Sequence, residues 1–273
     1  ISDSSYSAIK SGTYNGDVDK QMKKVIEYFE TKQAAAEIYV GTDYKETSIS
    51  SNVYKIIRNC QLQGGLAIAC GDAGIGKTQA CRQYYREHGT NCTYITVNPC
   101  IKSSKSVLEL IGSKLNVSSG SVSRLWLEIS SKLSDGMVII VDEAQHLTRN
   151  AIDTLRSLCD CFDEKGQTLG ICFVGNETTV SRLGGKQKAE FAQIRNRTKN
   201  TRFYSVKQIK KSDIEMLFPD IREDAAAVEF LLRIAQSPQA IRGAVNLYSN
   251  ALDNGNVTAK GLSAIAKYMD MAV

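Results

Sequence analysis

The sequence LAIACGDAGIGKT, residues 66–78, runs from an apolar stretch into a glycine-rich turn that closes on Lys-Thr. Residues 71–78 fit the pattern G-x-x-x-x-G-K-[ST] at every fixed position. The apolar residues before the pattern predict a buried strand at 66–70, and those after it predict a helix over 78–87. This order predicts a phosphate-binding loop, because free backbone N–H groups and a helix N-terminus both attract phosphate oxygens.

Separate roles are expected for the residues of this loop. Lys77 is expected to reach the β- and γ-phosphates of ATP, and Thr78 is expected to bind Mg²⁺. The other expected contacts with the nucleotide are Gly71, Asp72, Ala73, Gly74, Ile75, Gly76 and Gln79. The alternative is a glycine-rich turn without a ligand, and the strand and helix on either side argue against it.

Polar side chains follow two further apolar strands. Asp142 and Glu143 come directly after Met-Val-Ile-Ile-Val at 137–141, and Asn176 follows the strand predicted at 169–174. The carboxyl ends of parallel strands share one edge of a sheet, so these side chains are expected beside the phosphate loop. We expect Asp142 to bind Mg²⁺ through water, and Glu143 to polarise the attacking water with help from Asn176. The alternatives are helix-capping acids and an ordinary turn asparagine.

Strand and helix patterns alternate through residues 64–210 and predict a doubly wound α/β domain with a five-stranded parallel sheet. Residues 211–273 carry only helical patterns, which predict a small C-terminal helical lid. Residues 1–40 are expected to form a short N-terminal helical element, and 41–63 a linker with a short helix. The five predicted strands are 66–70, 93–97, 137–141, 169–174 and 202–206.

The composition of the chain limits its class. It has 273 residues, of which 42% are hydrophobic and 23% charged, and these proportions exclude a wholly disordered, collagen-like or coiled-coil protein. No apolar stretch approaches the roughly 20 residues that cross a bilayer. The eight cysteines include no C-x-x-C pair, so we expect buried free thiols and not a zinc site, in a cytoplasmic protein. The net charge of +5 suits a polyanionic partner.

Together these motifs resemble the AAA+ ATPases, and D-E-A-Q-H-L at 142–147 is similar to their DNA-transposition branch. The resemblance spans nearly the whole chain in the family's order. It implies an ATPase that binds double-stranded DNA without sequence preference, assembles with copies of itself as a filament, selects target DNA and activates a transposase. The other segments that carry it are Y-N-G-D (14–17), G-N (175–176), G-G-K-Q-K-A-E-F-A-Q (184–193) and K-K-S-D (210–213).

The same resemblance implies roles for two arginines and for the N-terminal residues. Arg197 would be the arginine finger that reaches the γ-phosphate of a neighbouring subunit, and Arg195 and Arg202 remain alternatives. Arg242, in Q-A-I-R at a predicted helix start, would be the second sensor of the nucleotide, with a surface arginine as the alternative. Residues 4–17 would match only the end of the family's N-terminal helix-turn-helix domain.

Two regions are candidates for contact with DNA. Residues 182–211 hold ten basic residues against Glu190 as the single acid, and this charge suits either phosphates or a subunit interface. The second region lies at two predicted helix starts after the strand at 93–97, where lysines and hydroxyls suit backbone phosphates and an ordinary capped helix pair is the alternative. Its candidate residues are Lys102, Ser103, Ser104, Lys105, Ser121 and Arg124.

Two other functions remain open from the sequence. A helicase-loader or replication-initiator ATPase of the same superfamily would share the nucleotide pocket and differ in its partner. A nucleotide-gated scaffold of signalling or secretion would not bind DNA at all. Binding of DNA that depends on nucleotide separates the scaffold from the ATPases of DNA metabolism.

Overall fold

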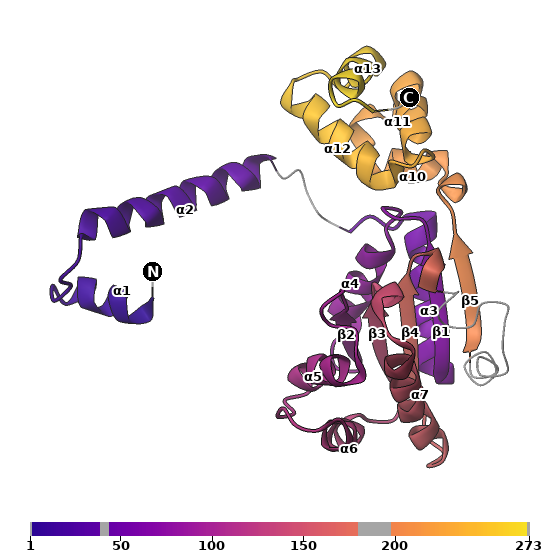
Figure 1. Ribbon diagram of the computed structural model, residues 1–273. Helices are drawn as coiled ribbons and strands as arrows, with labels where there is room; N and C mark the ends of the chain where they lie inside the picture. The colour runs from indigo at the N-terminus through magenta and orange to yellow at the C-terminus, as the bar shows by residue number, and fades with distance from the viewer. Residues whose placement is uncertain (1, 39–43, 180–197, 272–273) are drawn as a thin grey trace.

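The computed structural model describes residues 2–38, 44–179 and 198–271. Its centre is one sheet of five parallel strands in the order β2-β3-β4-β1-β5 (Figure 1). This arrangement confirms the predicted α/β class and the five-stranded parallel sheet. The strands are β1 (Gly65–Gly71), β2 (Cys92–Thr96), β3 (Met137–Asp142), β4 (Leu169–Gly175) and β5 (Thr198–Tyr204).

Helices cover both faces of the sheet, and alternate residues of each strand supply the two cores. Leu66, Ile68 and Cys70 of β1 pack in one cluster, and Ala67 and Ala69 pack in the other, as the period of two in a strand requires. The first cluster is covered by α5 (Ser104–Lys114), α6 (Val122–Lys132) and α7 (Arg149–Asp163), and the second by α3 (Ser48–Gln63) and α4 (Lys77–His88).

Helix α3 is longer than the short helix expected within residues 41–63. The hydroxyl of Thr47 accepts the N–H of Ser50 and so caps the helix within the polar stretch that suggested a linker. Its buried face includes Ile49, Val53 and Ile57, which recur at helical spacing and pack on the sheet. Residues 48–63 therefore belong structurally to the α/β unit.

The edge strand β5 begins four residues before the strand expected at 202–206. Its backbone pairs with β1 from Leu66 to Gly71, but only Tyr204 of its side chains is buried. An edge strand that buries so little side-chain surface leaves no alternating apolar pattern in the sequence. The strand therefore could be placed only by its pairing with β1.

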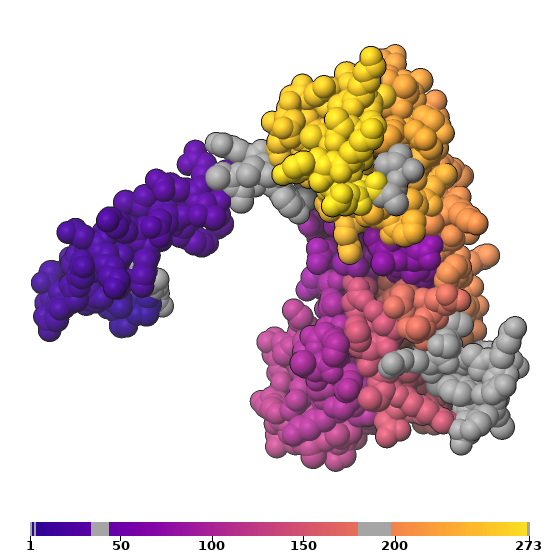
Figure 2. Space-filling model, turned by 45° about the horizontal axis from the view of Figure 1, so that its top comes forward, coloured from indigo at the N-terminus to yellow at the C-terminus, as the bar shows by residue number. Residues whose placement is uncertain are grey.

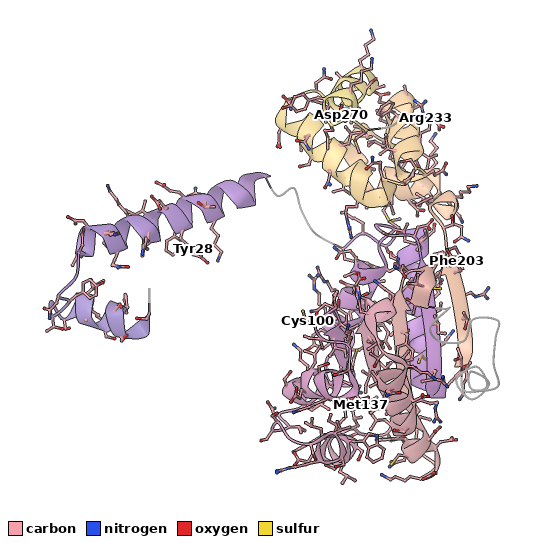
Figure 3. The ribbon with its side chains drawn as sticks, in the orientation of Figure 1. Tyr28, Cys100, Met137, Phe203, Arg233 and Asp270 are labelled. Carbon is pink, nitrogen blue, oxygen red and sulfur yellow. The ribbon has the colours of Figure 1, made fainter. Side chains whose placement is uncertain are left out.

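The C-terminal helices form a compact bundle (Figure 2), which lies over the carboxyl end of the sheet (Figure 1). Figure 3 labels Met137 at the start of β3 and Phe203 near the end of β5, so the strands run toward this bundle. Its core is continuous with the cluster under α3 and α4. The bundle consists of α10 (Lys211–Leu217), α11 (Ala225–Ala235), α12 (Ala240–Asp253) and α13 (Ala259–Tyr268).

Asp213 joins this bundle to the α/β unit. Its side chain is 2% exposed, and its Oδ1 accepts hydrogen bonds from the N–H and the hydroxyl of Ser48 at 2.6 and 2.8 Å. Its Oδ2 accepts the N–H of Lys210 at 2.9 Å. Because a buried carboxylate is stable only with such partners, these bonds fix the first helix of the bundle against the start of α3.

The N-terminal residues that the structure describes form α1 (Asp3–Lys10) and α2 (Val18–Ile38), which supply the expected N-terminal helical element. None of the helices within the described ranges has the length and apolar character needed to cross a membrane. All eight cysteines are free thiols, and six of them are buried.

Candidate active site

The phosphate loop follows β1 and leads into α4, as the sequence predicted. Gly74 and Gly76 have φ angles of 75° and 97°, in the left-handed region that residues with a Cβ rarely adopt. A Cβ on Gly71 would lie 2.0 Å from the carbonyl oxygen of Tyr204, so glycine also allows the loop to touch the end of β5. These conformations allow the chain to turn tightly between the end of β1 and the start of α4.

Several loop residues have structural contacts in addition to any ligand. The N–H of Asp72 donates to the carbonyl of Tyr204 at 3.0 Å, and its Oδ2 accepts the N–H of Val206 at 2.8 Å. The side chain of Ile75 is fully buried in the core, whereas Ala73 and Gln79 are exposed. The hydrogen bonds of Asp72 therefore connect the loop to the segment after β5, and the buried side chain of Ile75 holds the loop against the core.

The ammonium group of Lys77 lies inside the loop. Its Nζ donates to the carbonyl oxygens of Gly71 at 2.9 Å and Asp72 at 2.6 Å. Burial lowers the pKa of Lys77, and the nearby carboxylates of Asp142 and Glu143 act in the opposite direction. The loop lysine and both predicted acids thus share one electrostatic environment.

Asp142 ends β3 with its side chain only 2% exposed. Burial raises the pKa of Asp142, and hydrogen bonds from Thr78, the N–H of Glu143 and the hydroxyl of Tyr94 partly offset this effect. The distances to Glu143 N and Tyr94 Oη are 3.0 and 3.1 Å. The structure therefore brings together Thr78 and Asp142, and their hydroxyl and carboxylate oxygens fit the ligand preference of Mg²⁺.

Tyr94 was not identified from the sequence. In the register of β2 on β3, Thr96 lies opposite Asp142, and Tyr94 lies two residues earlier on the same face. The hydroxyl of Tyr94 donates to Asp142 Oδ2 and accepts from the hydroxyl of Thr96 at 3.2 Å. Only the pairing of two strands shows this contact, because nothing in the alternation of residues 93–97 marks Tyr94 as polar-facing.

Glu143 and Asn176 lie at neighbouring strand ends, as expected. Glu143 precedes the short 3₁₀ helix of Ala144–His146, and its carboxylate accepts a hydrogen bond from the amide of Gln145. The side-chain oxygen of Asn176 accepts from the N–H and the hydroxyl of Thr178. Asn176 therefore makes the contacts expected of an ordinary turn asparagine, and it also lies at the edge of the site.

The lid bundle reaches the phosphate loop at the start of α12. The backbone N–H of Arg242 donates to the carbonyl of Gly74 at 3.1 Å. A Cβ on Gly74 would lie 3.2 Å from the Cβ atoms of both Ala240 and Arg242. The side chain of Arg242 is exposed, so its position beside the loop is set by its backbone.

Comparison with known protein families identifies the domain that carries this site. A family model for an AAA domain matches residues 60–183, which include the phosphate loop, the two acids and Asn176. The chain contains an AAA domain.

Among solved structures, the chain is similar in fold to the Thermotoga maritima RuvB Holliday junction branch migration motor and to the Aeropyrum pernix ORC2 protein. RuvB is 16% identical with a TM-score of 0.50, over 84% of this chain and 70% of that one. ORC2 is 12% identical with a TM-score of 0.60, over 83% and 70%. These likenesses support the fold.

Relatives match beyond the AAA domain. The chain is 28% identical to the ATP-dependent target DNA activator B of Escherichia phage Mu, over 96% of this chain and 81% of the relative. It is also 28% identical to the Mu-like prophage FluMu DNA transposition protein B of Haemophilus influenzae, over 89% and 85%. The resemblance to the AAA+ ATPases of DNA transposition, and to phage Mu transposition protein B among them, is confirmed.

The predicted arginine finger is not among the residues that the structure describes. Arg197, its alternative Arg195 and the rest of residues 182–197 of the basic region lie outside the described residues. Arg202 is described, on β5, where its side chain is exposed.

The residues predicted to contact DNA have the contacts of a capped helix pair. Ser103 and Ser121 accept the N–H groups of Ser106 and Arg124 and so cap α5 and α6. Lys102 is exposed in the loop before α5, two residues after Cys100, which Figure 3 labels, and the carbonyl of Lys102 accepts the N–H of Thr148 at 3.0 Å. The other contacts are Ser104 with Thr154, Lys105 with Glu109 at 3.9 Å and Arg124 with Glu128 at 2.6 Å.

Burial of Asp142 predicts that Asp142→Asn stabilises the nucleotide-free protein at pH 7. Because burial raises its pKa, Asp142 keeps its proton to a higher pH in the folded than in the unfolded chain. The free energy of unfolding therefore falls as pH rises above 3.8, the pKa of this carboxyl group in the unfolded chain. Thermal unfolding with a metal chelator should give the variant a higher melting temperature at pH 7, and the difference should shrink toward pH 4.

Asp135→Asn is the matched control for this measurement. Hydrogen bonds from Thr168 lower the pKa of Asp135, so that carboxylate stabilises the fold above its unfolded pKa and the substitution should act in the opposite direction. If Asp142→Asn leaves the melting temperature at pH 7 unchanged or lowers it, burial of the Asp142 carboxylate does not destabilise the nucleotide-free protein.

Proposed function

We propose that this chain is an ATP-dependent, DNA-binding ATPase that selects target DNA and activates a transposase. The observation that carries the proposal is the meeting of Lys77, Asp142 and Glu143 at the sheet edge of an AAA domain. The names of the relatives, which describe target DNA activation and DNA transposition, supply the biological role. Their origin in phages and a prophage favours the cytoplasm of a bacterial cell.

ATP would bind with its phosphates along the loop. Lys77 would exchange the carbonyl oxygens of Gly71 and Asp72 for phosphate oxygens, a move that needs only rotation of a flexible side chain. Thr78 and Asp142 would hold Mg²⁺, which when bound neutralises charge on the phosphates. Arg242, next to Gly74, would sense the nucleotide from the lid.

Glu143 would act on the attacking water. A carboxylate at the edge of a partly enclosed site can accept the proton of that water as it attacks the γ-phosphate, a contribution of about 10²–10⁴ in rate. Asn176 at the next strand end would help to orient the same water. The finger that completes the site, Arg197 or one of its alternatives, would come from a neighbouring copy in a filament.

DNA would lie against the starts of α5 and α6. Lys102, Lys105 and Arg124 are exposed there, beside helix N-termini that favour phosphate oxygens. We find no set of side chains suited to base edges in the described residues of these two helix starts, so binding would be independent of sequence. The bond from Thr148 N–H to the Lys102 carbonyl connects this surface to the segment that follows Glu143.

Glu143→Gln should retain binding of ATP and lose turnover. The substitution keeps the shape of the side chain and leaves the phosphate loop intact, but it removes the proton acceptor, so the hydrolysis rate should fall by about 10² or more. Nucleotide affinity and steady-state hydrolysis measure the two effects, and complexes of the variant with DNA should outlive those of the parent protein. Normal turnover would overturn the assignment of Glu143.

Lys102→Glu with Lys105→Glu should weaken DNA binding and flatten its dependence on salt. Each lost phosphate contact removes about 0.9 from the slope of log K against log salt, so the slope should fall by about 2 while ATP binding persists. The matched control is Lys260→Glu with Lys267→Glu, an equal charge reversal at exposed positions on α13 of the lid. Equal slopes for the two double variants would move the proposed DNA surface elsewhere, first to residues 182–211.

A further inference from the structure

The backbone at Glu143 is held in an uncommon conformation. Its φ and ψ angles are 59° and 33°, in the left-handed region, which is unfavourable for a residue with a Cβ. Two hydrogen bonds hold it there: Glu143 N–H donates to Asp142 Oδ1, and the Glu143 carbonyl accepts the N–H of His146, both at 3.0 Å. The start of the glutamate side chain is therefore fixed.

The amide of Gln145 fixes the other end of that side chain. Its Nε2 donates to Glu143 Oε2, and its Oε1 accepts the backbone N–H of Asn176 at 3.2 Å. A backbone N–H can only donate, so the amide oxygen must face Asn176 and the amide nitrogen must face the carboxylate. Gln145 thus bridges the ends of β3 and β4 in one defined orientation.

Gly175 provides the space for this bridge. A Cβ at that position would lie 2.3 Å from Thr179 Oγ1, 2.5 Å from Gln145 Oε1 and 3.3 Å from the backbone nitrogen of Ala144. Real Cβ atoms do not approach an oxygen so closely, and the backbone of Gly175 lies in an extended strand. The glycine therefore leaves room for the side chains of both Gln145 and Thr179, and it is not needed for an unusual backbone angle.

We propose that Gln145 is a positioning residue that holds the carboxylate of Glu143 in place for ATP hydrolysis. The proposal rests on the role given to Glu143 under the proposed function. An ionised carboxylate has about four acceptor sites, so the bond from Gln145 to Oε2 orients the group and leaves Oε1 for a water. Because the same amide is bonded to the backbone of Asn176, the two residues expected to act on that water are kept in a fixed relation.

Replacement of Gln145 should lower kcat without a matching change in KM. In Gln145→Ala the carboxylate loses its tether, and misplacement by about 1 Å can cost about 10²-fold in rate; we expect kcat to fall by about 10–100-fold. KM for ATP and the melting temperature should stay close to those of the parent protein. Gln145→Glu, which keeps the shape but replaces the donor by a second carboxylate, should lose at least as much. Gln167→Ala, at an exposed glutamine before β4, should leave kcat unchanged.

A double-mutant cycle shows whether Gln145 acts through Glu143. Single-turnover hydrolysis is compared for the parent, Gln145→Ala, Glu143→Gln and the double variant. If Gln145 only positions Glu143, its removal should change the residual rate of Glu143→Gln by less than about twofold. If Gln145→Ala lowers the rate equally in the parent protein and in Glu143→Gln, the positioning role of Gln145 is wrong. The same holds if Gln145→Ala keeps a normal kcat while Glu143→Gln is inactive. Either result would leave the proposed function intact. Normal turnover in Glu143→Gln would overturn the proposed function, and the positioning role with it.

Discussion

The parallel pairing of β1 with β4, and of β4 with β3, is the constraint on which the rest of the site depends. In-register pairing of three strands delivers the phosphate loop, Asp142 and Asn176 to the same edge of the sheet. The outer strands complete the edge: β5 supports the loop through Tyr204, and β2 supplies the hydroxyl of Tyr94 to Asp142. A change in the register of any one pair would separate groups that must act within a few ångströms of each other.

This edge brings together charged side chains of which Asp142 is buried and Lys77 and Glu143 are partly buried. Burial lowers the pKa of Lys77 and raises that of Asp142, so the fold weakens the charged form of each. Hydrogen bonds from Thr78, Tyr94 and the backbone of Glu143 offset part of that cost for the carboxylate. Such a balance favours binding of an ion-rich ligand over maximal stability, a compromise common at functional sites. The backbone contact of Arg242 with Gly74 joins the lid to this edge.

The sequence was sufficient for the features that depend on local patterns and insufficient for those that depend on side-chain geometry. Residues 66–78 predicted the strand, loop and helix because each has a strong local signal. The beginning of β5 and the full length of α3 were missed, since an edge strand buries little and the capping Thr47 lies in a polar stretch. Tyr94 and Gln145 could not be found, because their importance comes from contacts between different strand ends.

Binding of duplex DNA under three nucleotide conditions tests the central claim, that the occupant of this sheet edge controls the engagement of DNA. A labelled duplex of random sequence is titrated with the full chain in ATP and Mg²⁺, in ADP and Mg²⁺, and without nucleotide. The account predicts tight binding with ATP and a loss of affinity of about tenfold or more in the other two conditions, a typical coupling between two sites. Equal affinity in all three conditions, or no binding in any of them, would contradict it.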